Sequence, residues 1–275
     1  MPPPFHSVSL RLEYRNVTMR FADRGGSGVL TAVRGVSFAL ADGEVVSLIG
    51  PSGCGKSTLL AVGSGLLAPS EGAALVDGVP VEGPNAHVAF MLQKDLLLPW
   101  RTVAENVMFG VEIQGVPQAE RRRRAANLLA QFNLAEFSDH YPHQLSGGMR
   151  QRVALARTLA VDPHVLLLDE PFSAVDAQTR MLLQRDLAQT LSRAQKTALL
   201  ITHDLFEAVT LSDRVLVMSR RPGAIIDEIV VDVPGRADPI ARRADPKVAT
   251  YVARLMERLD IAHAPLERQP AAGNV

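Results

Sequence analysis

The hydrophobic positions of this sequence fall into short apolar runs that are separated by longer stretches of helical periodicity. Residues 45–49, 165–168 and 198–201 are almost entirely apolar, which is typical of strands buried on both faces. Helical patterns occupy residues 103–134 and 148–160. Short buried strands that alternate with helices predict an α/β fold built on a mainly parallel sheet with both faces covered.

The two ends of the chain follow other patterns. Leu10, Leu12 and Tyr14 alternate with polar residues, which predicts a half-buried strand, and a glycine-rich turn at 22–28 leads to a second strand at 33–40. The far end predicts three more elements, namely strands at 215–218 and 225–231 near an edge of the sheet and a charged helix at 244–259.

The composition of the chain excludes several classes of protein. The chain has 275 residues, of which 47% are hydrophobic, and its 29 basic residues balance 29 acidic ones. A chain of this length buries a sizeable core without disulfides, and the lack of basic excess argues against a protein whose main task is to bind nucleic acid. The single cysteine excludes an intramolecular disulfide and an all-cysteine zinc cluster. Neither a signal peptide nor an apolar stretch of membrane-spanning length occurs, so we expect a cytoplasmic chain.

The strongest chemical signal is a glycine-rich loop between a predicted strand and a predicted helix. It fits the pattern G-x-x-x-x-G-K-[ST], with the residues Gly50, Pro51, Ser52, Gly53, Cys54, Gly55, Lys56 and Ser57, and Thr58 follows. The glycines let successive N–H groups point at phosphate oxygens, and the start of the helix adds its positive dipole end. Lys56 would contact the β- and γ-phosphates and the Ser57 hydroxyl would ligate Mg²⁺. Cys54 is either a thiol made reactive by nearby amides or, more simply, a small residue that fits the loop.

Two further segments carry groups suited to a nucleotide. Asp169 and Glu170 end a buried strand, at the edge of an open sheet where nucleotides bind. Asp169 is the candidate for holding Mg²⁺, and Glu170 is the candidate base that polarises the attacking water. Ser146, Gly147 and Gly148 open a helix, where exposed N–H groups and a hydroxyl form either an ordinary N-cap or a second anion site.

Together these motifs resemble the ATP-binding cassette (ABC) family, the nucleotide-hydrolysing subunits of membrane transporters. The phosphate loop, Gln93, a signature motif at 145–149, the Asp169–Glu170 pair, residues 173–176 and residues 202–204 occur in the order of the family. The resemblance covers roughly residues 10–235. It implies a P-loop NTPase core with a mainly parallel sheet, an N-terminal antiparallel β subdomain and an inserted helical signature subdomain. The expected division is a flexible lead-in at 1–9, the ATP-binding domain at 10–235 with its helical insert at about 95–160, and a C-terminal helix and tail at 236–275.

The resemblance also implies a site shared by two copies of the chain. Each ATP would lie between the phosphate loop of one copy and Ser146, Gly147 and Gly148 of the other. Further roles follow from the family's motifs: Gln93 at Mg²⁺ and the attacking water, His203 at the γ-phosphate, Asp176 across the dimer and Phe21 stacked on adenine. Two positions depart from the family pattern, Met149 for the usual Gln and Val175 for the commoner Leu, while Glu170 and His203 are intact. We therefore expect a competent ATPase with ATP and Mg²⁺ as cofactors.

The segment after Gln93 bears on what the ATPase drives. This segment resembles the corresponding one in importers of the nitrate, sulfonate and taurine type through Leu97, Leu98, Pro99 and Trp100. Importers of thiamine-precursor pyrimidines share the same run of residues. Trp100 is then either an exposed anchor for a membrane permease or a residue of a satellite core. The basic run 121–124 is better explained as a solvated helix face than as a lipid or nucleic-acid site.

We therefore expect the motor subunit of a bacterial importer at the cytoplasmic face of the inner membrane. The resemblance implies as partners a second copy of the chain, two transmembrane permease subunits and, indirectly, a solute-binding protein, with no nucleic acid. The alternatives are a motor for a pyrimidine importer and a soluble ABC ATPase that acts on DNA or ribosomes. The latter usually carries tandem cassettes or a long coiled coil, and neither occurs in this sequence.

Overall fold

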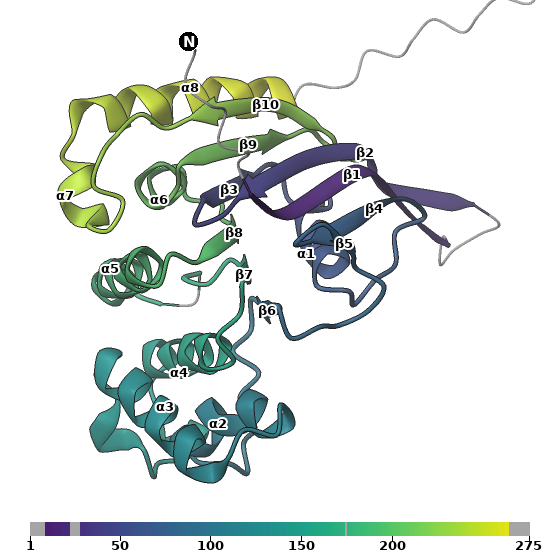
Figure 1. Cartoon of the computed structure of the whole chain (residues 1–275). Helices are drawn as coiled ribbons and strands as arrows, with labels where there is room; N and C mark the ends of the chain where they lie inside the picture. Colours follow the sequence, from purple (N-terminus) through teal and green to yellow (C-terminus); the bar gives the residue numbers. More distant parts are fainter. Residues whose placement is uncertain (1–8, 23–27, 174, 264–275) are drawn as a thin grey trace, which may run out of the picture.

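Two sheets organise the chain in the computed structural model, which describes residues 9–22, 28–173 and 175–263 (Figure 1). The larger sheet has the strand order β10-β9-β3-β8-β7-β6, and its neighbours are parallel except β10 and β9. Its strands are β3 (Val45–Ile49), β6 (Val88–Met91), β7 (Val165–Asp169), β8 (Thr197–Ile201), β9 (Arg214–Met218) and β10 (Ile225–Val230). The predicted parallel sheet is thus present, and of the two late strands β10 forms the edge while β9 lies inside.

The smaller sheet is antiparallel and comes mainly from the start of the chain. Its order is β2-β1-β4-β5, with β1 (Leu10–Ala22), β2 (Val29–Ala41), β4 (Glu71–Val76) and β5 (Val79–Pro80). β2 begins earlier than the predicted 33–40 because Val29 and Leu30 pair with the end of β1. Residues 23–27 of the predicted turn lie outside the described residues.

The strands of the larger sheet bury alternate residues in different cores. Val46, Leu167 and Leu199 face α1 (Lys56–Gly63) and the antiparallel sheet. Leu166 and Ala198 face the opposite way, toward α4 (Gly147–Ala160) and α5 (Ala177–Arg193). A strand turns successive side chains to opposite faces, so strands covered on both sides must be apolar throughout, as these are.

Three further helices, α6 (Leu205–Leu211), α7 (Pro239–Arg243) and α8 (Pro246–His263), lie at the end of the larger sheet that β9 and β10 form. α6 and α8 pack beside β9 and β10, with α7 between them along the chain. The predicted charged helix is therefore present with shifted bounds.

Residues 1–8 and 264–275, predicted as lead-in and tail, lie outside the described residues. Within the described part of the chain, no helix combines the length and the hydropathy that a membrane span requires.

A helical unit projects from the far end of the larger sheet (Figure 1). It consists of α2 (Val103–Ile113), α3 (Gln118–Gln131) and α4, with two short 3₁₀ turns at Ala135–Phe137 and Pro142–Gln144. The predicted helical stretch 103–134 is divided, because Gly115 has a positive φ of 73° and Pro117 is the non-helical N-cap of the next helix. The fully buried Phe132 and Leu134 anchor the core of this unit.

One buried side chain fixes the loop that leads into α2. Asn106 is fully buried, its Oδ1 accepts from the N–H of Leu98 at 2.8 Å, and its Nδ2 donates to the carbonyl of Leu98 at 3.1 Å. The same Nδ2 also lies at 3.1 and 3.0 Å from the carbonyl oxygens of Arg101 and Thr102. The loop that carries Trp100 is therefore held by side-chain hydrogen bonds, and a sequence pattern gives no sign of them.

We predict that Asn106→Ala lowers the free energy of unfolding by about 2–4 kcal/mol, because several buried backbone groups lose their partners at once. Urea denaturation measures this difference. Gln114→Ala serves as the control, since the exposed Gln114 makes only a 3.4 Å contact to the carbonyl of Val161. Equal stabilities of the two variants would contradict the role given to Asn106.

Candidate nucleotide site

The glycine-rich loop runs from the end of β3 to the start of α1, as the sequence predicts. Gly53 and Gly55 have φ values of 73° and 106°, which residues with a Cβ rarely adopt. A Cβ on Gly55 would also lie 2.4 Å from Cγ1 of Val33 on β2. Lys56 folds back over the loop, where its Nζ donates to the carbonyl oxygens of Gly50 at 2.7 Å and Pro51 at 3.0 Å.

A segment far along the chain supports this loop from behind. Gly223 joins β2 through two backbone hydrogen bonds of 2.9 Å, one to Ala32 and one from Arg34. A Cβ on Gly223 would lie 2.0 Å from the carbonyl oxygen of Cys54, so the segment and the loop are in direct contact. Arg221 donates from Nε and Nη2 to the carbonyl of Gly53 at 3.1 and 2.8 Å. Neither Arg221 nor Gly223 was predicted from the sequence, although Pro222 and Gly223 together are a turn signal.

The structure corrects one possibility raised for Cys54. Its side chain is buried, and this burial raises the pKa of the thiol above its ordinary value, despite the nearby Lys56. A raised pKa disfavours the reactive thiolate. Cys54 is therefore a small buried residue that belongs to the hydrophobic core under the loop.

Nine of the predicted residues line one cleft of about 430 Å³, a volume in the range of small-molecule sites, whereas Gly50, Pro51, Cys54, Asp169 and His203 are not part of its lining. Phe21 and Leu30, from the antiparallel sheet, lie at one side, and Gln93 and Glu170 lie at the carboxyl ends of β6 and β7. The lining includes Phe21, Leu30, Ala32, Ser52, Gly53, Gly55, Lys56, Ser57, Thr58, Gln93, Glu170, Ile201 and Arg221. The cleft thus combines apolar groups at one end with the phosphate loop and acidic groups at the other.

Polar side chains meet at the acidic end of the cleft. Gln93 Nε2 donates to Oε2 of Glu170 at 3.0 Å, and His203 Nδ1 lies 3.4 Å from the same oxygen. Glu170 has a φ of 46°, a strained conformation for a residue with a side chain, and its N–H donates to Ile201 of β8 at 3.0 Å. The carboxylate of Glu170, directly after β7, therefore contacts Gln93, which follows β6, and His203, which follows β8.

Asp169 precedes this carboxylate and is largely buried. Burial raises its pKa above the ordinary value, although hydrogen bonding from the Ser57 hydroxyl and the charge of Lys56 act in the opposite direction. The carboxylate of Asp169 and the hydroxyl of Ser57 form an oxygen pair next to the phosphate loop. Oxygen donors of this kind suit a hard cation such as Mg²⁺.

The signature residues lie apart from this cleft. Ser146 is the N-cap of α4, with its Oγ accepting from the N–H of Met149 at 3.3 Å, and Asp176 is the N-cap of α5. The two helix starts are neighbours, because a Cβ on Gly148 would lie 2.6 Å from Cγ2 of Thr179. Among the described residues that line the cleft, none comes from 146–148 or from position 176.

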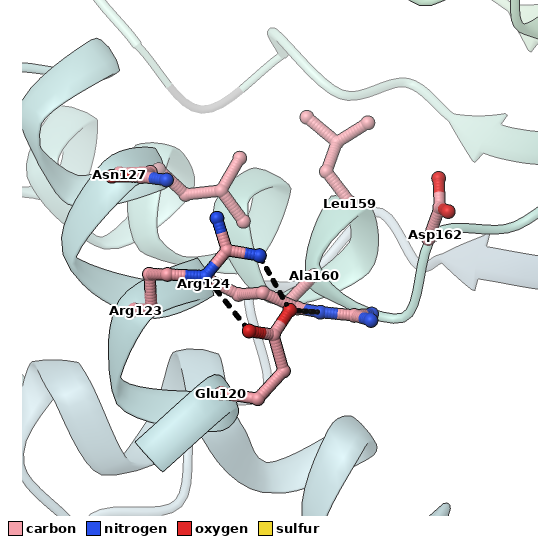
Figure 2. Close-up of a pocket in the computed structure, with 8 residues that line it drawn as sticks. Glu120, Arg123, Arg124, Asn127, Leu159, Ala160 and Asp162 are labelled. Atoms are coloured by element: carbon pink, nitrogen blue, oxygen red, sulfur yellow. Dashed lines mark hydrogen bonds and ion pairs between the residues drawn. The ribbon is translucent and has the colours of Figure 1, made fainter. Parts of the chain in front are cut away.

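A second hollow lies on the helical unit, between α3 and the end of α4 (Figure 2). Arg123 and Arg124 point toward Glu120 and bond to its carboxylate at 2.8 Å, which holds the pKa of Glu120 at about 2. The two guanidinium groups share one carboxylate of their own helix. This arrangement agrees with the interpretation of residues 121–124 as a solvated helix face.

A buried carboxyl group lies next to His203. Glu207 on α6 is buried, and Nε2 of Gln184 donates to its Oε2 at 3.1 Å. Burial raises the pKa of Glu207 to about 8, with hydrogen bonding to Thr202 opposing the shift. Glu207 is therefore a neutral acid at pH 7, and our sequence analysis did not single it out.

The geometry defines a P-loop nucleotide-binding protein, and comparisons with known proteins identify its family. The model of the ABC transporter family matches residues 33–173. An uncharacterised ABC transporter ATP-binding protein of Methanocaldococcus jannaschii is 44% identical over 226 residues, covering 82% of this chain and 84% of that protein. The taurine import ATP-binding protein TauB of Burkholderia pseudomallei is 43% identical over 249 residues, covering 89% of this chain and 95% of that protein.

Solved structures agree with these relatives. The dimeric structure of an ATP-binding cassette in a post-hydrolysis state, bound to ADP and Pi, matches with a TM-score of 0.72 and 31% identity. The match covers 80% of this chain and 98% of that one. The chain belongs to the ABC transporter family, and it is an ATP-binding ATPase with the P-loop NTPase fold expected from the sequence.

We predict that Gly223→Ala lowers nucleotide affinity at least tenfold, because the new methyl group would overlap the carbonyl of Cys54 and displace the phosphate loop. Titration with a fluorescent ATP analogue measures the affinity, and circular dichroism confirms folding. Gly83→Ala is the matched control, since a Cβ there would meet nothing within 4 Å. Unchanged affinity in a folded Gly223→Ala protein would contradict the supporting role of this segment.

A second prediction concerns the pH dependence of stability. The folded chain keeps a proton on Glu207 up to about pH 8, whereas the unfolded chain releases it near pH 4.5, so a rising pH favours unfolding. Relative to Glu207→Gln, the wild-type unfolding free energy should fall by about 1.4 kcal/mol per pH unit between these values. Urea denaturation at pH 5.5, 6.5 and 7.5 checks this slope. Glu257→Gln, at an exposed position of α8, should keep the wild-type slope.

Proposed function

We propose that this ATPase is the motor subunit of a bacterial importer for a small solute of the nitrate, sulfonate or taurine type. In this proposal ATP binds at two sites, each shared by two copies of the chain. Binding closes the pair, and hydrolysis of the shared γ-phosphate reopens it. The similarity to taurine import proteins at 43–45% identity supports the importer type.

The proposal of a shared site rests on the separation, within one chain, of the phosphate loop from the signature residues. The phosphate loop faces the cleft, while Ser146, Gly147 and Gly148 open α4 outside it. Helix starts with free N–H groups bind anions well, and a second copy would supply them to the γ-phosphate. Asp176 lies at the neighbouring helix start and would lie at the same dimer contact. The dimeric form of the similar cassette bound to ADP and Pi supports this arrangement.

Within the cleft we assign one role to each polar group. Phe21 would stack on adenine, and Gly50, Pro51, Ser52, Gly53, Cys54, Gly55, Lys56, Ser57 and Thr58 would hold the phosphates. Glu170 would take the proton of the attacking water, Gln93 would orient that water and His203 would contact the γ-phosphate. Ser57, Asp169 and Gln93 offer oxygen donors for Mg²⁺, which when bound would neutralise charge on the β- and γ-phosphates.

The observation that carries the importer assignment is the exposure of Trp100. The residue is 71% exposed, although tryptophan is usually largely buried. This exposure favours the anchor over the satellite-core interpretation. Asn106 holds the loop around it, which follows Gln93 by only a few residues. A rigid exposed aromatic side chain is a good anchor for a partner protein. We propose that a transmembrane permease subunit covers it, with two permeases and an external solute-binding protein completing the complex at the cytoplasmic face of the inner membrane.

Of the two alternatives, only one differs from the proposal in the use of Trp100. A motor for a thiamine-precursor pyrimidine importer would use the identical contact, so only the solute on the binding protein separates it from the favoured assignment. A soluble ABC ATPase would leave Trp100 without a membrane partner. Purification of the native complex through a tag on this chain would distinguish these cases.

We predict that Glu170→Gln forms a dimer when ATP is added and returns to a monomer when ATP is removed. Blocking hydrolysis should preserve the γ-phosphate that both copies hold, so the closed pair accumulates. Size-exclusion chromatography with light scattering measures the mass with and without ATP.

The control is the same variant with Ser146→Arg added, which keeps the phosphate loop but places a bulky side chain at the shared contact. It should bind ATP and remain a monomer. ATP-dependent dimers in this control, or tight ATP binding by Glu170→Gln with no dimer at any concentration, would count against the site shared by two copies.

A further inference from the structure

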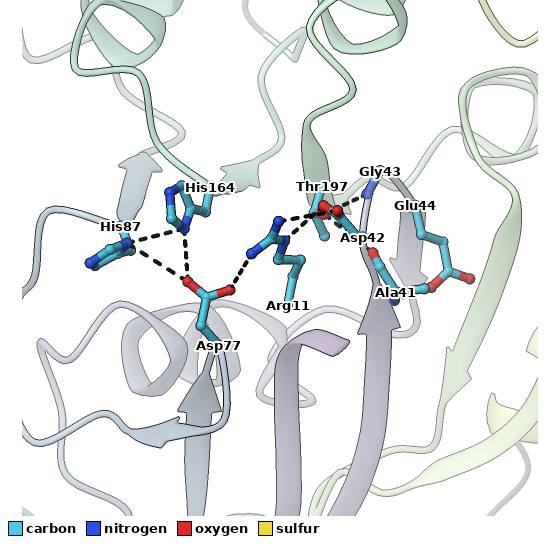
Figure 3. A network of polar contacts seen from close by, with 9 residues as sticks. All are labelled: Arg11, Ala41, Asp42, Gly43, Glu44, Asp77, His87, His164 and Thr197. Atoms are coloured by element: carbon cyan, nitrogen blue, oxygen red, sulfur yellow. Dashed lines mark hydrogen bonds and ion pairs between the residues drawn. The ribbon is translucent and has the colours of Figure 1, made fainter. Parts of the chain in front are cut away.

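Three ligand-type side chains meet at the end of the sheet opposite the nucleotide cleft (Figure 3). Nδ1 of His164 lies 2.7 Å from Oδ2 of Asp77 and 3.0 Å from Nδ1 of His87, and Nδ1 of His87 lies 3.7 Å from the same carboxylate oxygen. Their side chains are between 28% and 55% exposed, so ions in solution reach them. None of these residues belongs to the cleft described above.

Three separate segments bring these atoms together, and each is fixed by its backbone. Asp77 occupies the turn between β4 and β5 with a φ of 50°, and its N–H donates to the carbonyl of Arg11 at 3.0 Å. His87 and His164 directly precede the paired strands β6 and β7, and the N–H groups of His164 and Val165 both donate to the carbonyl of His87, at 2.9 and 3.0 Å. The cluster is therefore part of the folded framework.

Arg11 completes the framework by holding the other side of the carboxylate. Its Nη1 lies 2.7 Å from Oδ1 of Asp77, and its Nε and Nη2 bond to Asp42 at 2.7 and 3.1 Å (Figure 3). Oδ2 of Asp77 is thereby turned toward the two imidazoles. Ligating carboxylates in metal sites are commonly oriented by a hydrogen bond of this kind.

Hydrogen bonding alone satisfies these three atoms poorly. A neutral imidazole nitrogen carries either a proton or a lone pair, and the carboxylate oxygen only accepts. If His164 Nδ1 donates to Asp77, the same N–H must be shared with the lone pair of His87; if His164 Nδ1 accepts from His87, its lone pair faces the carboxylate oxygen. A metal ion engages all three lone pairs at once.

The separations also match a metal centre. Bonds of 2.0–2.1 Å in a tetrahedral site place ligand atoms about 3.3 Å apart, and the observed 2.7, 3.0 and 3.7 Å bracket that value. Two imidazoles and one carboxylate suit zinc among the divalent metals. We propose that Asp77, His87 and His164 form a Zn²⁺ site, with water as the fourth ligand, that links the antiparallel sheet to the start of β6 and β7.

The test uses the full chain, stripped with EDTA, and two metals as probes. Calorimetric titration with Zn²⁺ should give one site of micromolar affinity or tighter, and Co²⁺ should give the visible absorption of a tetrahedral centre. His87→Gln and His164→Gln should each weaken Zn²⁺ binding at least tenfold and remove the Co²⁺ absorption. Both variants should unfold at the wild-type temperature in EDTA, which separates loss of a ligand from loss of the fold.

Two matched variants exclude other histidines as the source of binding. His143→Gln changes an exposed histidine on the helical unit, and His203→Gln changes the histidine beside the nucleotide cleft. Both should keep wild-type Zn²⁺ affinity and Co²⁺ absorption. The proposal is overturned if wild type binds no Zn²⁺, or if the double variant His87→Gln/His164→Gln binds it as tightly as wild type.

Discussion

The nucleotide site depends on close contact between the phosphate loop and the backbone behind it. A loop that binds phosphate through its N–H groups must keep side chains out of its concave face, so it cannot be stabilised from that side. In this chain the support comes from Val33 on β2, whose side chain lies against Gly55, and from Gly223, whose backbone touches the carbonyl of Cys54. Gly55 and Gly223 are needed for this reason: any larger residue at either position would push the loop out of shape.

The rest of the cleft follows from the strand order of the larger sheet. β3, β8, β7 and β6 are parallel neighbours, so their carboxyl ends reach the same edge. Gln93 and His203, which are far from Glu170 in sequence, are thereby both brought within reach of its carboxylate. The alternation of buried faces gives each of these strands two packed sides, which fixes their positions firmly.

Sequence reasoning recovered the parts of this protein that depend on local pattern or on a motif with fixed spacing. The apolar runs at β3, β7 and β8, the phosphate loop and the acidic pair after β7 were all predicted, because each is encoded by neighbouring residues. β4, β5 and β6 were not predicted, because β5 and β6 have only two and four residues and β4 begins with Glu71 and Gly72 instead of a continuous apolar run. Arg221, Asn106 and Glu207 were missed for a different reason: their importance arises from burial or contacts that only the folded chain creates.

The short strands β6 and β7 have a consequence for how the chain tolerates changes in length. β6 has four residues and β7 has five, and each carries a histidine directly before it, while Gln93 and Glu170 lie at the far ends. One inserted residue in either strand would reverse every side chain beyond it and separate the two ends of the sheet from their partners. Insertions beside the exposed Gly115, in the connection between α2 and α3, would by contrast lengthen a surface turn. For two of the groups that line the cleft, spacing along the chain is therefore as strict a requirement as residue identity.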